Sequence, residues 1–261
     1  MNSTESLKTY GGGLQPVLGI AQCKAVLSWS EPDLANELSS EKIQILNWNI
    51  KKGKKRNWSD DLSSYSTDKH LVLIQEATVS MGLLDILSGT QFSSFSPGFI
   101  SGGEISGVAT FSQVEPIGRC RLESMEPWLG TPKLTNITRY ALSDSDETLV
   151  VVNIHAVNFS FGLDDYRQQI QQVTEVLSVH TGPVVFSGDF NTWREGRLQT
   201  LLETVSTMNV QHVSFDEDHR VKFLGSVLDH VFIRGLEVLA ANTHQVNSSD
   251  HNPLSLSLRL Y

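Results

Sequence analysis

Val184–Trp193, VVFSGDFNTW, is the stretch of sequence that decides the fold. Its apolar start, VVF, predicts a short buried strand. The strand leads to Asp189 and Asn191 before a helical pattern begins. Residues two apart in an extended segment point to the same side, so we expect this carboxylate and this amide to face one spot at the carboxyl edge of a sheet, where open α/β sheets place ligands. A carboxylate with an amide donor suits phosphate chemistry; an ordinary turn is the alternative.

Length and composition are those of a globular protein. The 261 residues are 39% hydrophobic and 19% charged, with no low-complexity tract, and are long enough to bury a sizeable core. The formal net charge of −9 argues against a surface that is basic throughout. Broad electrostatic capture of duplex nucleic acid is therefore not favoured, although a local basic patch is compatible with this charge.

The two cysteines, Cys23 and Cys120, are too few and too far apart to predict a disulfide framework or a zinc knuckle. No apolar run of about 18 residues is present, so we expect no transmembrane helix. The first twenty residues lack the apolar segment of a secretory signal. These features predict a reduced, cytoplasmic protein, and we expect a monomer.

Residues 1–40 are interpreted as an N-terminal extension, packed on the domain or partly disordered, with a helix start at Ser30–Asp33. Residues 41–261 are predicted to form one α/β domain. Strands are expected at 43–50, 71–74, 107–112, 137–142, 149–154, 184–186, 228–233 and 254–260. Helices are expected at 81–87, after 164 and after 193, and an irregular stretch between 112 and 137.

Polar side chains recur where the predicted strands end. Six such places, far apart in sequence, carry Asn49, Glu76, His155 with Asn158, Asp189 with Asn191, Asp229, and Asp250 with His251. One such group would be an accident of loop composition, whereas six of them indicate a shared site.

The motifs around these residues resemble those of the endonuclease/exonuclease/phosphatase superfamily, in the same order. They are NWNI (47–50), LIQE (73–76), IHAVN (154–158), SGDFN (187–191), LDHVF (228–232) and SSDHNP (248–253). That superfamily includes DNase I-like nucleases, abasic-site endonucleases, inositol polyphosphate 5-phosphatases and neutral sphingomyelinases. The resemblance spans about residues 43–260 and is strongest to a bacterial, YafD-like branch. It implies a DNase I-like four-layer sandwich of two mixed, mainly antiparallel β-sheets flanked by helices.

The resemblance also implies a metal site. Glu76 matches the principal metal carboxylate, with Asn49 beside it and Asp250 completing the oxygen ligands. Hard oxygen donors without thiolates suit Mg²⁺ or Mn²⁺ rather than zinc.

The remaining matched positions imply catalytic roles. His251 matches the histidine that contacts the scissile phosphate, and Asp229 matches the carboxylate that orients its imidazole. Asp189 matches the residue that aligns and deprotonates the attacking water, and Asn191 would donate to the phosphoryl oxygens. His155 occupies a position that is His in DNase I-like members.

Substrate binding is predicted for Asn158 and for a basic run that follows Asn49. The run comprises Lys51, Lys52, Lys54, Lys55 and Arg56. It is either a solvated loop or a device for capturing phosphate at the mouth of the site.

The leading hypothesis is a metal-dependent phosphodiester hydrolase of the nuclease type, acting on nucleic acid. A phospholipid or inositol-phosphate phosphohydrolase is the alternative within the fold, and a catalytically weak phosphate-binding module is the alternative of another class. The loops 51–68, 89–106 and 113–135 show no hydrophobic hairpin suited to membrane insertion.

Overall fold

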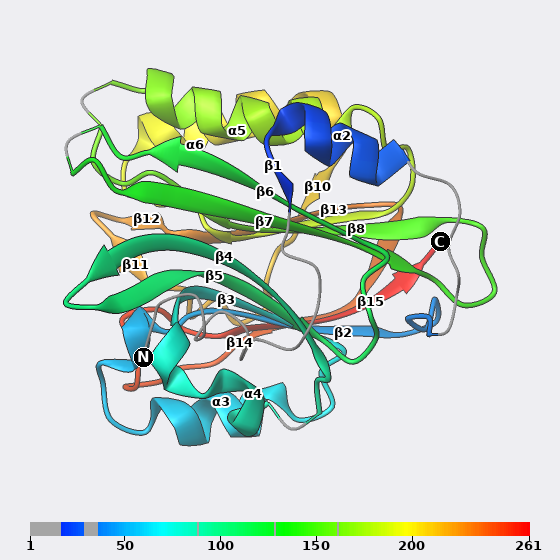
Figure 1. Cartoon of the computed structure of the whole chain (residues 1–261), viewed down its shortest axis with the longest axis horizontal. Helices are drawn as coiled ribbons and strands as arrows, with labels where there is room; N and C mark the ends of the chain where they lie inside the picture. Colours follow the sequence, from blue (N-terminus) through cyan, green and yellow to red (C-terminus); the bar gives the residue numbers. More distant parts are fainter. Residues whose placement is uncertain (1–16, 29–35, 88, 128, 161) are drawn as a thin grey trace.

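The computed structural model describes residues 17–28, 36–87, 89–127, 129–160 and 162–261. They form four layers, with two β-sheets face to face and helices on both outer sides (Figure 1). Most neighbouring strands are antiparallel, and the pairs β1–β6, β8–β9 and β2–β3 are parallel. The DNase I-like sandwich predicted from the motifs is confirmed.

One sheet has seven strands in the order β1-β6-β7-β8-β9-β13-β10. Their bounds are β1 (Val17–Leu18), β6 (Gly118–Met125), β7 (Pro132–Ala141), β8 (Thr148–His155), β9 (Val184–Asp189), β13 (Asp229–Arg234) and β10 (Gln211–His212). Its outer face is covered by α2 (Ile20–Ser28), α5 (Asp164–Leu177) and α6 (Glu195–Val205) (Figure 1).

The other sheet has six strands in the order β14-β15-β2-β3-β5-β4. Their bounds are β14 (Leu236–Thr243), β15 (Leu254–Leu260), β2 (Ile43–Asn49), β3 (Leu71–Thr78), β5 (Glu104–Ser112) and β4 (Phe92–Ser101). Helices α3 (Trp58–Ser66) and α4 (Leu83–Ile86) lie on its outer face, and a small hairpin, β11 (Lys222–Phe223) with β12 (Ser226–Val227), precedes β13. Single 3₁₀ turns lie at Lys51–Gly53, Val79–Met81 and Ser206–Met208.

Alternation along each strand explains why the central strands are apolar on both faces over most of their length. In β8, Leu149 and Val151 enter the layer between the sheets, whereas Val150 and Val152 face the helices on the outside. In β2, Ile43 and Ile45 enter the inter-sheet layer, and Leu46 and Trp48 face α3 and α4. Side chains alternate between the faces of a strand, so a strand covered on both faces is a nearly continuous apolar run in the sequence.

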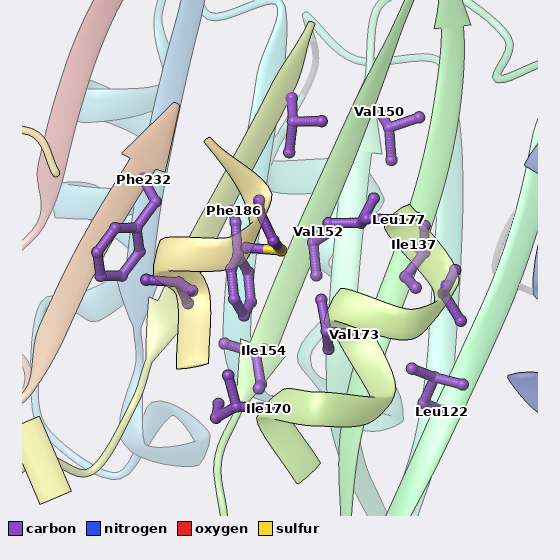
Figure 2. Packing of buried hydrophobic residues seen from close by; sticks show 14 of the residues in the cluster. Leu122, Ile137, Val150, Val152, Ile154, Ile170, Val173, Leu177, Phe186 and Phe232 are labelled. Atoms are coloured by element: carbon purple, nitrogen blue, oxygen red, sulfur yellow. The ribbon is translucent and has the colours of Figure 1, made fainter. Parts of the chain in front are cut away.

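The helix α5 packs its apolar stripe on the seven-stranded sheet. Figure 2 shows Ile170, Val173 and Leu177 meeting Val152 and Ile154, which lie on the sheet below them. The spacing of three and four residues places these side chains on one face of the helix. The predicted amphipathic helix is therefore confirmed, and it begins at Asp164.

The described part of the N-terminal region is packed on the domain. Strand β1 pairs with β6, and α2 contacts β6 and α5. The helix start predicted at Ser30–Asp33 lies outside the described residues. Among the described residues, none of the helices has the length and apolarity needed to cross a bilayer.

The expectation of reduced cysteines is wrong for this structure. Cys23 on α2 and Cys120 on β6 form a disulfide across 97 residues, with Cα atoms 5.3 Å apart. Residues far apart in sequence became neighbours through the sheet, which sequence spacing could not show. The cytoplasmic location stays a prediction, and the disulfide favours an oxidising compartment instead.

The stretch between 112 and 137, predicted to be irregular, contains β6 and the first half of β7. Strands β4 and β14 were not predicted either, and both lie at edges of the six-stranded sheet. Edge strands are only half covered and tolerate polar residues and proline. Because β4 contains Pro97 and several serines, it has no apolar run from which a strand could be predicted.

Candidate active site

Strand register brings the predicted catalytic residues together. His155 on β8 lies beside Asp189 on β9, and Asp189 lies beside Asp229 on β13. In its strand, each of the three lies an even number of residues from a side chain that enters the layer between the sheets. Their side chains therefore point into this layer as well. The side chain of Asn49, at the end of β2, points into this layer for the same reason. The site is therefore the polar end of the inter-sheet layer, at the strand ends drawn on the left of Figure 1.

Gly188 allows β8 and β9 to approach closely beside the site. Its φ is +149°, and a Cβ atom there would lie 2.0 Å from the carbonyl oxygen of Ile154. Any side chain would force the two strands apart. The glycine before Asp189 is thus a packing requirement of the strand pair that carries His155 and Asp189.

Asp189 is the centre of the hydrogen-bond network. The side-chain amide of Asn49 donates to Asp189 Oδ2 at 2.9 Å, and the backbone N–H of Asn191 donates to Oδ1 at 2.9 Å. Burial raises the pKa of the Asp189 carboxyl, outweighing the opposing effect of His251. A carboxylate with a raised pKa is a better proton acceptor, as a general base requires.

His251 is paired with Asp229. Its Nδ1 is 2.7 Å from Asp229 Oδ2, and its Nε2 is 3.7 Å from Asp189 Oδ2. Burial lowers the pKa of His251, but the carboxylates of Asp229 and Asp189 raise it more, to about 10. The indole Nε1–H of Trp48 donates to the His251 carbonyl at 2.9 Å and holds this loop against β2. The imidazolium is therefore a fixed, charged donor.

His155 is joined by a residue that the sequence did not single out. Lys133 Nζ lies 2.9 Å from His155 Nε2, and His155 Nε2 lies 3.6 Å from Asp189 Oδ2. Burial, with the charge of Lys133, lowers the pKa of His155 well below its usual value. A charged lysine can only donate, so Nε2 accepts and the proton sits on Nδ1. The cation was missed because it opens β7, away from every motif.

Asn191 reaches the site by a different path from the one predicted. The strand ends at Asp189, and Asn191 has φ +50°, so the two residues are not in one extended segment. They meet instead through the turn in which Asp189 Oδ1 accepts the Asn191 N–H. The side-chain amide of Asn191 donates to the carbonyl of Ala156 at 2.9 Å. One of its two N–H bonds is thus used to hold the loop after β8.

One of the predicted metal ligands, Asp250, is paired with a lysine. Lys51 Nζ is 2.6 Å from Asp250 Oδ2, and the field of Glu76 adds to Asp250 in raising the pKa of Lys51. Glu76 has φ +54° at a bulge where the register of β3 shifts between Ile74 and Ala77. Strained backbone of this kind is often found at functional sites.

The donors fit a hard divalent cation. Glu76, Asp250 and the amide oxygen of Asn49 are all oxygen atoms, the ligands that Mg²⁺ and Mn²⁺ prefer. The ammonium of Lys51 is paired with one of these groups, Asp250. In addition, one ligand atom from each of Asp189, Asp229 and His251 lies within 4.8 Å of the others. His251 Nδ1 in that group is already hydrogen-bonded to Asp229.

A cavity of about 210 Å³ opens beside these residues. Its charged side includes Glu76, Glu126, Lys52, Lys133 and His155. Its other wall is largely apolar and includes Phe99, Val108, Leu129, Pro132, Leu134 and Phe159. The cavity therefore offers cations and a histidine to one part of a ligand and an apolar surface to the rest.

Asn158 lies in the loop that forms one wall of this cavity. Its backbone N–H donates to Glu126 Oε1 at 2.8 Å, and its carbonyl accepts from Arg197. Its neighbour Phe159, rather than Asn158 itself, lines the cavity. The structure thus places Asn158 at the edge of the site, held through its backbone by a buried carboxylate and a buried guanidinium.

The basic run divides between two roles. Lys51 and Lys52 reach the site, as described, whereas Lys55 Nζ donates to the carbonyl of Ser249 at 2.7 Å and ties the run to the loop of His251. Lys54 and Arg56 are exposed.

Comparisons with known proteins agree with this geometry. A model of the endonuclease/exonuclease/phosphatase family matches residues 46–251. The chain is 41% identical to the UPF0294 protein of Vibrio campbellii over 220 residues, which are 84% of this chain and 78% of that relative. This confirms the YafD-like bacterial branch that the motifs predict.

Solved structures show the same fold. The catalytic domain of human Nocturnin with a bound sulfate anion has a TM-score of 0.67 at 17% identity, covering 87% of this chain and 96% of that one. An endonuclease/exonuclease/phosphatase from Beutenbergia cavernae has a TM-score of 0.65 at 14% identity, covering 84% of this chain and 72% of that one.

Proposed function

Because this chain belongs to the endonuclease/exonuclease/phosphatase family, we propose that it is a divalent-metal-dependent phosphodiester hydrolase. One observation carries the proposal. A buried carboxylate, Asp189, has Oδ2 3.6 Å from His155 Nε2 and 3.7 Å from His251 Nε2. Burial raises the pKa of Asp189 and lowers that of His155, whereas the neighbouring carboxylates raise that of His251. Phosphoester hydrolysis needs a base for water and a charged donor for the phosphoryl oxygen, and this cluster supplies both.

Each side chain has a defined task in this reaction. Asp189 accepts a proton from the attacking water, and Asn49 keeps its carboxylate in place through the hydrogen bond to Oδ2. His251 donates from Nε2 to a phosphoryl oxygen, while Asp229 holds Nδ1 and stabilises the imidazolium. Lys133 brings positive charge to the same edge of the cavity. Asn191 has a second amide N–H left to donate to the phosphate.

Glu76, Asn49 and Asp250 would hold Mg²⁺ or Mn²⁺, whose charge offsets the negative charge that develops on the phosphate and the leaving oxygen. Lys51 occupies the same carboxylate in the structure described here. Lys51 contacts only Oδ2, so Oδ1 of Asp250 is the oxygen that would be offered to the metal while this ion pair is kept.

A soluble diester tests the proposal directly. We expect the purified full chain to hydrolyse bis-para-nitrophenyl phosphate with Mg²⁺ or Mn²⁺ and to stop when a chelator is added. Glu76→Gln is expected to lower kcat at least about 100-fold. Glu203→Gln, on the exposed face of α6, is the matched control. Mn²⁺ is expected to raise the Tm of the parent chain but not that of the Glu76→Gln variant.

Two results would contradict the proposal. One is turnover that survives both chelation and the Glu76→Gln change. The other is metal-independent binding of phosphate without any turnover, which would support the phosphate-binding module instead. Single-stranded and duplex DNA and RNA belong in the same assay, because a nuclease-type activity is what the sequence predicts.

A further inference from the structure

Exposed apolar side chains gather on the loops around the catalytic edge. Among the described residues, twelve large apolar side chains are exposed, and seven of them belong to four connections at this edge. They are Phe99 and Ile100 at the end of β4, Met125 at the end of β6, Leu129 in the β6–β7 loop, Phe159 after β8, and Phe223 with Leu224 in the β11–β12 hairpin. We call these seven residues the apolar rim.

The four connections lie at the same end of the sandwich, on the left of Figure 1. Contacts of the active site join three of them to it, since Phe99, Leu129 and Phe159 line the same cavity as Glu76 and His155. The β11–β12 hairpin is joined through Leu228, which follows it and whose carbonyl accepts the N–H of Phe190, next to Asp189. Single exposed apolar residues are ordinary, but a group of them around one cavity indicates an interaction surface.

Members of the rim are strongly exposed. Leu224 is 77% exposed, Leu129 is 61% exposed and Ile100 is 58% exposed, although leucine and isoleucine side chains are usually buried. Four of the seven are aliphatic and three are phenylalanines, so the rim offers apolar contact area of both kinds. An apolar partner fits every member of the rim, whereas base stacking would use only the three rings.

The same edge carries the basic run. Five of the twenty Lys and Arg residues of this acidic chain lie between Lys51 and Arg56, and Lys52 lines the cavity with the apolar wall. Apolar side chains mixed with lysines suit the boundary between acyl chains and anionic headgroups.

We propose that the catalytic edge docks on an anionic phospholipid surface and that the substrate is the phosphodiester of a lipid headgroup. The headgroup phosphate would lie against Lys133 and His155, and the lipid's apolar part against Phe99, Leu129 and Phe159. The inference rests on the proposed function, since it names the substrate class of the same site. It also differs from what the loop sequences suggest, because no single hairpin is hydrophobic and the rim forms only when four connections meet.

Vesicle sedimentation of the full chain, with a chelator present to prevent turnover, tests the docking. The vesicles are of phosphatidylcholine alone and of phosphatidylcholine mixed with phosphatidylglycerol. We expect binding to the mixed vesicles and about tenfold weaker partitioning for Ile100→Ser with Leu224→Ser, because each apolar side chain contributes through its buried area. The matched control is Leu202→Ser with Leu239→Ser, exposed residues of α6 and β14 away from this edge.

Turnover is then measured on the same mixed vesicles and on bis-para-nitrophenyl phosphate, with metal added. We expect the ratio of vesicle to soluble-diester turnover to fall about tenfold in the rim variant and to stay at the parent value in the control. Absence of vesicle binding, or equal binding by the rim and control variants, would overturn the inference. So would hydrolysis of nucleic acid but not of vesicles. Failure on the soluble diester would instead overturn the proposed function.

Discussion

Asp229 acts on the reaction only through His251, which it holds in place. Its contribution can therefore be measured separately from substrate binding. Asp229 is buried beside β9 and holds His251 Nδ1 at 2.7 Å. In Asp229→Asn the imidazolium loses both its orientation and the charge that stabilises it. We expect kcat on a soluble diester to fall about 100-fold or more, with a small change in KM. Asp164→Asn, which removes an exposed carboxylate paired with Arg167 on α5, is the control.

Gly188 leads to a prediction about stability. In Gly188→Ala the new Cβ would meet the Ile154 carbonyl at 2.0 Å, so β8 and β9 have to separate. We expect the free energy of unfolding to fall by about 3 kcal/mol or more, measured by denaturant titration. In Gly196→Ala, within α6, the new Cβ meets only Leu163 Cδ1 at 3.6 Å. That change is expected to stabilise by about 0.5–1 kcal/mol, and a loss as large as that of Gly188→Ala would contradict this account.

The identity of the site residues was predictable where they stand at one end of an apolar strand. Asn49 and Asp189 are the last residues of β2 and β9, and Asp229 is the first residue of β13. Strand register and a hydrogen bond place the three together. Lys133 was not predictable, because nothing near it in sequence is apolar enough to mark a strand end. The position of the Asn191 side chain could not be predicted from the sequence either, because it depends on the positive φ of Asn191 itself.

At the scale of secondary-structure elements, the link between α2 and β6 is covalent. The disulfide between Cys23 and Cys120 closes a loop of 97 residues. Cross-links over loops of this length typically stabilise by about 2–4 kcal/mol, mainly by restricting the unfolded chain. Cys120→Ala is therefore expected to lower the free energy of unfolding by about that amount.

Reduction of the parent chain provides the comparison for the disulfide variant. The reductant is expected to destabilise the parent to the level of Cys120→Ala and to leave the variant unaffected. A thiol assay on the unfolded, unreduced parent should find none of its two cysteines free. Two free thiols in that assay would contradict the prediction.

Elements were predictable in proportion to how much of them is buried. The strands β2, β8 and β9 are covered on both faces and were evident as apolar runs. The strand β6 has the sequence GRCRLESM and a burial pattern that alternates, with charged residues on one side. Its place in the sheet comes from pairing with β7 rather than from its own composition.

At the scale of the whole molecule, the buried histidines predict how stability depends on pH. Burial lowers the pKa of His155 and His230 well below 6.5, so at acid pH the unfolded chain binds protons that the folded chain does not. Stability is therefore expected to fall as the pH drops below about 6.5. His251 has its pKa raised to about 10, so its stabilising contribution is complete below 6.5 and is lost as the pH rises toward 10.

The metal-free protein should accordingly be most stable near neutral pH, in denaturant titrations between pH 5 and pH 10. His230→Asn is expected to reduce the slope of the acid limb by about 1.4 kcal/mol per pH unit, the effect of one proton. The alkaline limb should be unaffected, because His230 stays neutral there. An acid limb of the same slope in the parent and the variant would show that other groups control it.

The overall architecture was predictable from the motifs, whereas the joining of the two sheets was not. Gln75 on β3 donates to Asn47 at 2.9 Å and to Asn153 at 2.6 Å, which connects the six-stranded sheet to the seven-stranded one just behind the site. These amides lie inside strands whose neighbours are apolar, and only the packed sheets show why they are tolerated there.

The strand order of the six-stranded sheet bears on when the molecule can become active during synthesis. The strand β15 lies between β14 and β2, so β2, near residue 45, can pair with β15 only after the chain near residue 256 has been made. Pairing over such a separation is slow, because the intervening chain must first be brought into place. A nascent chain that has not reached this strand lacks both the seam of its sheet and a fixed His251. A chain whose synthesis is incomplete should therefore have no hydrolytic activity.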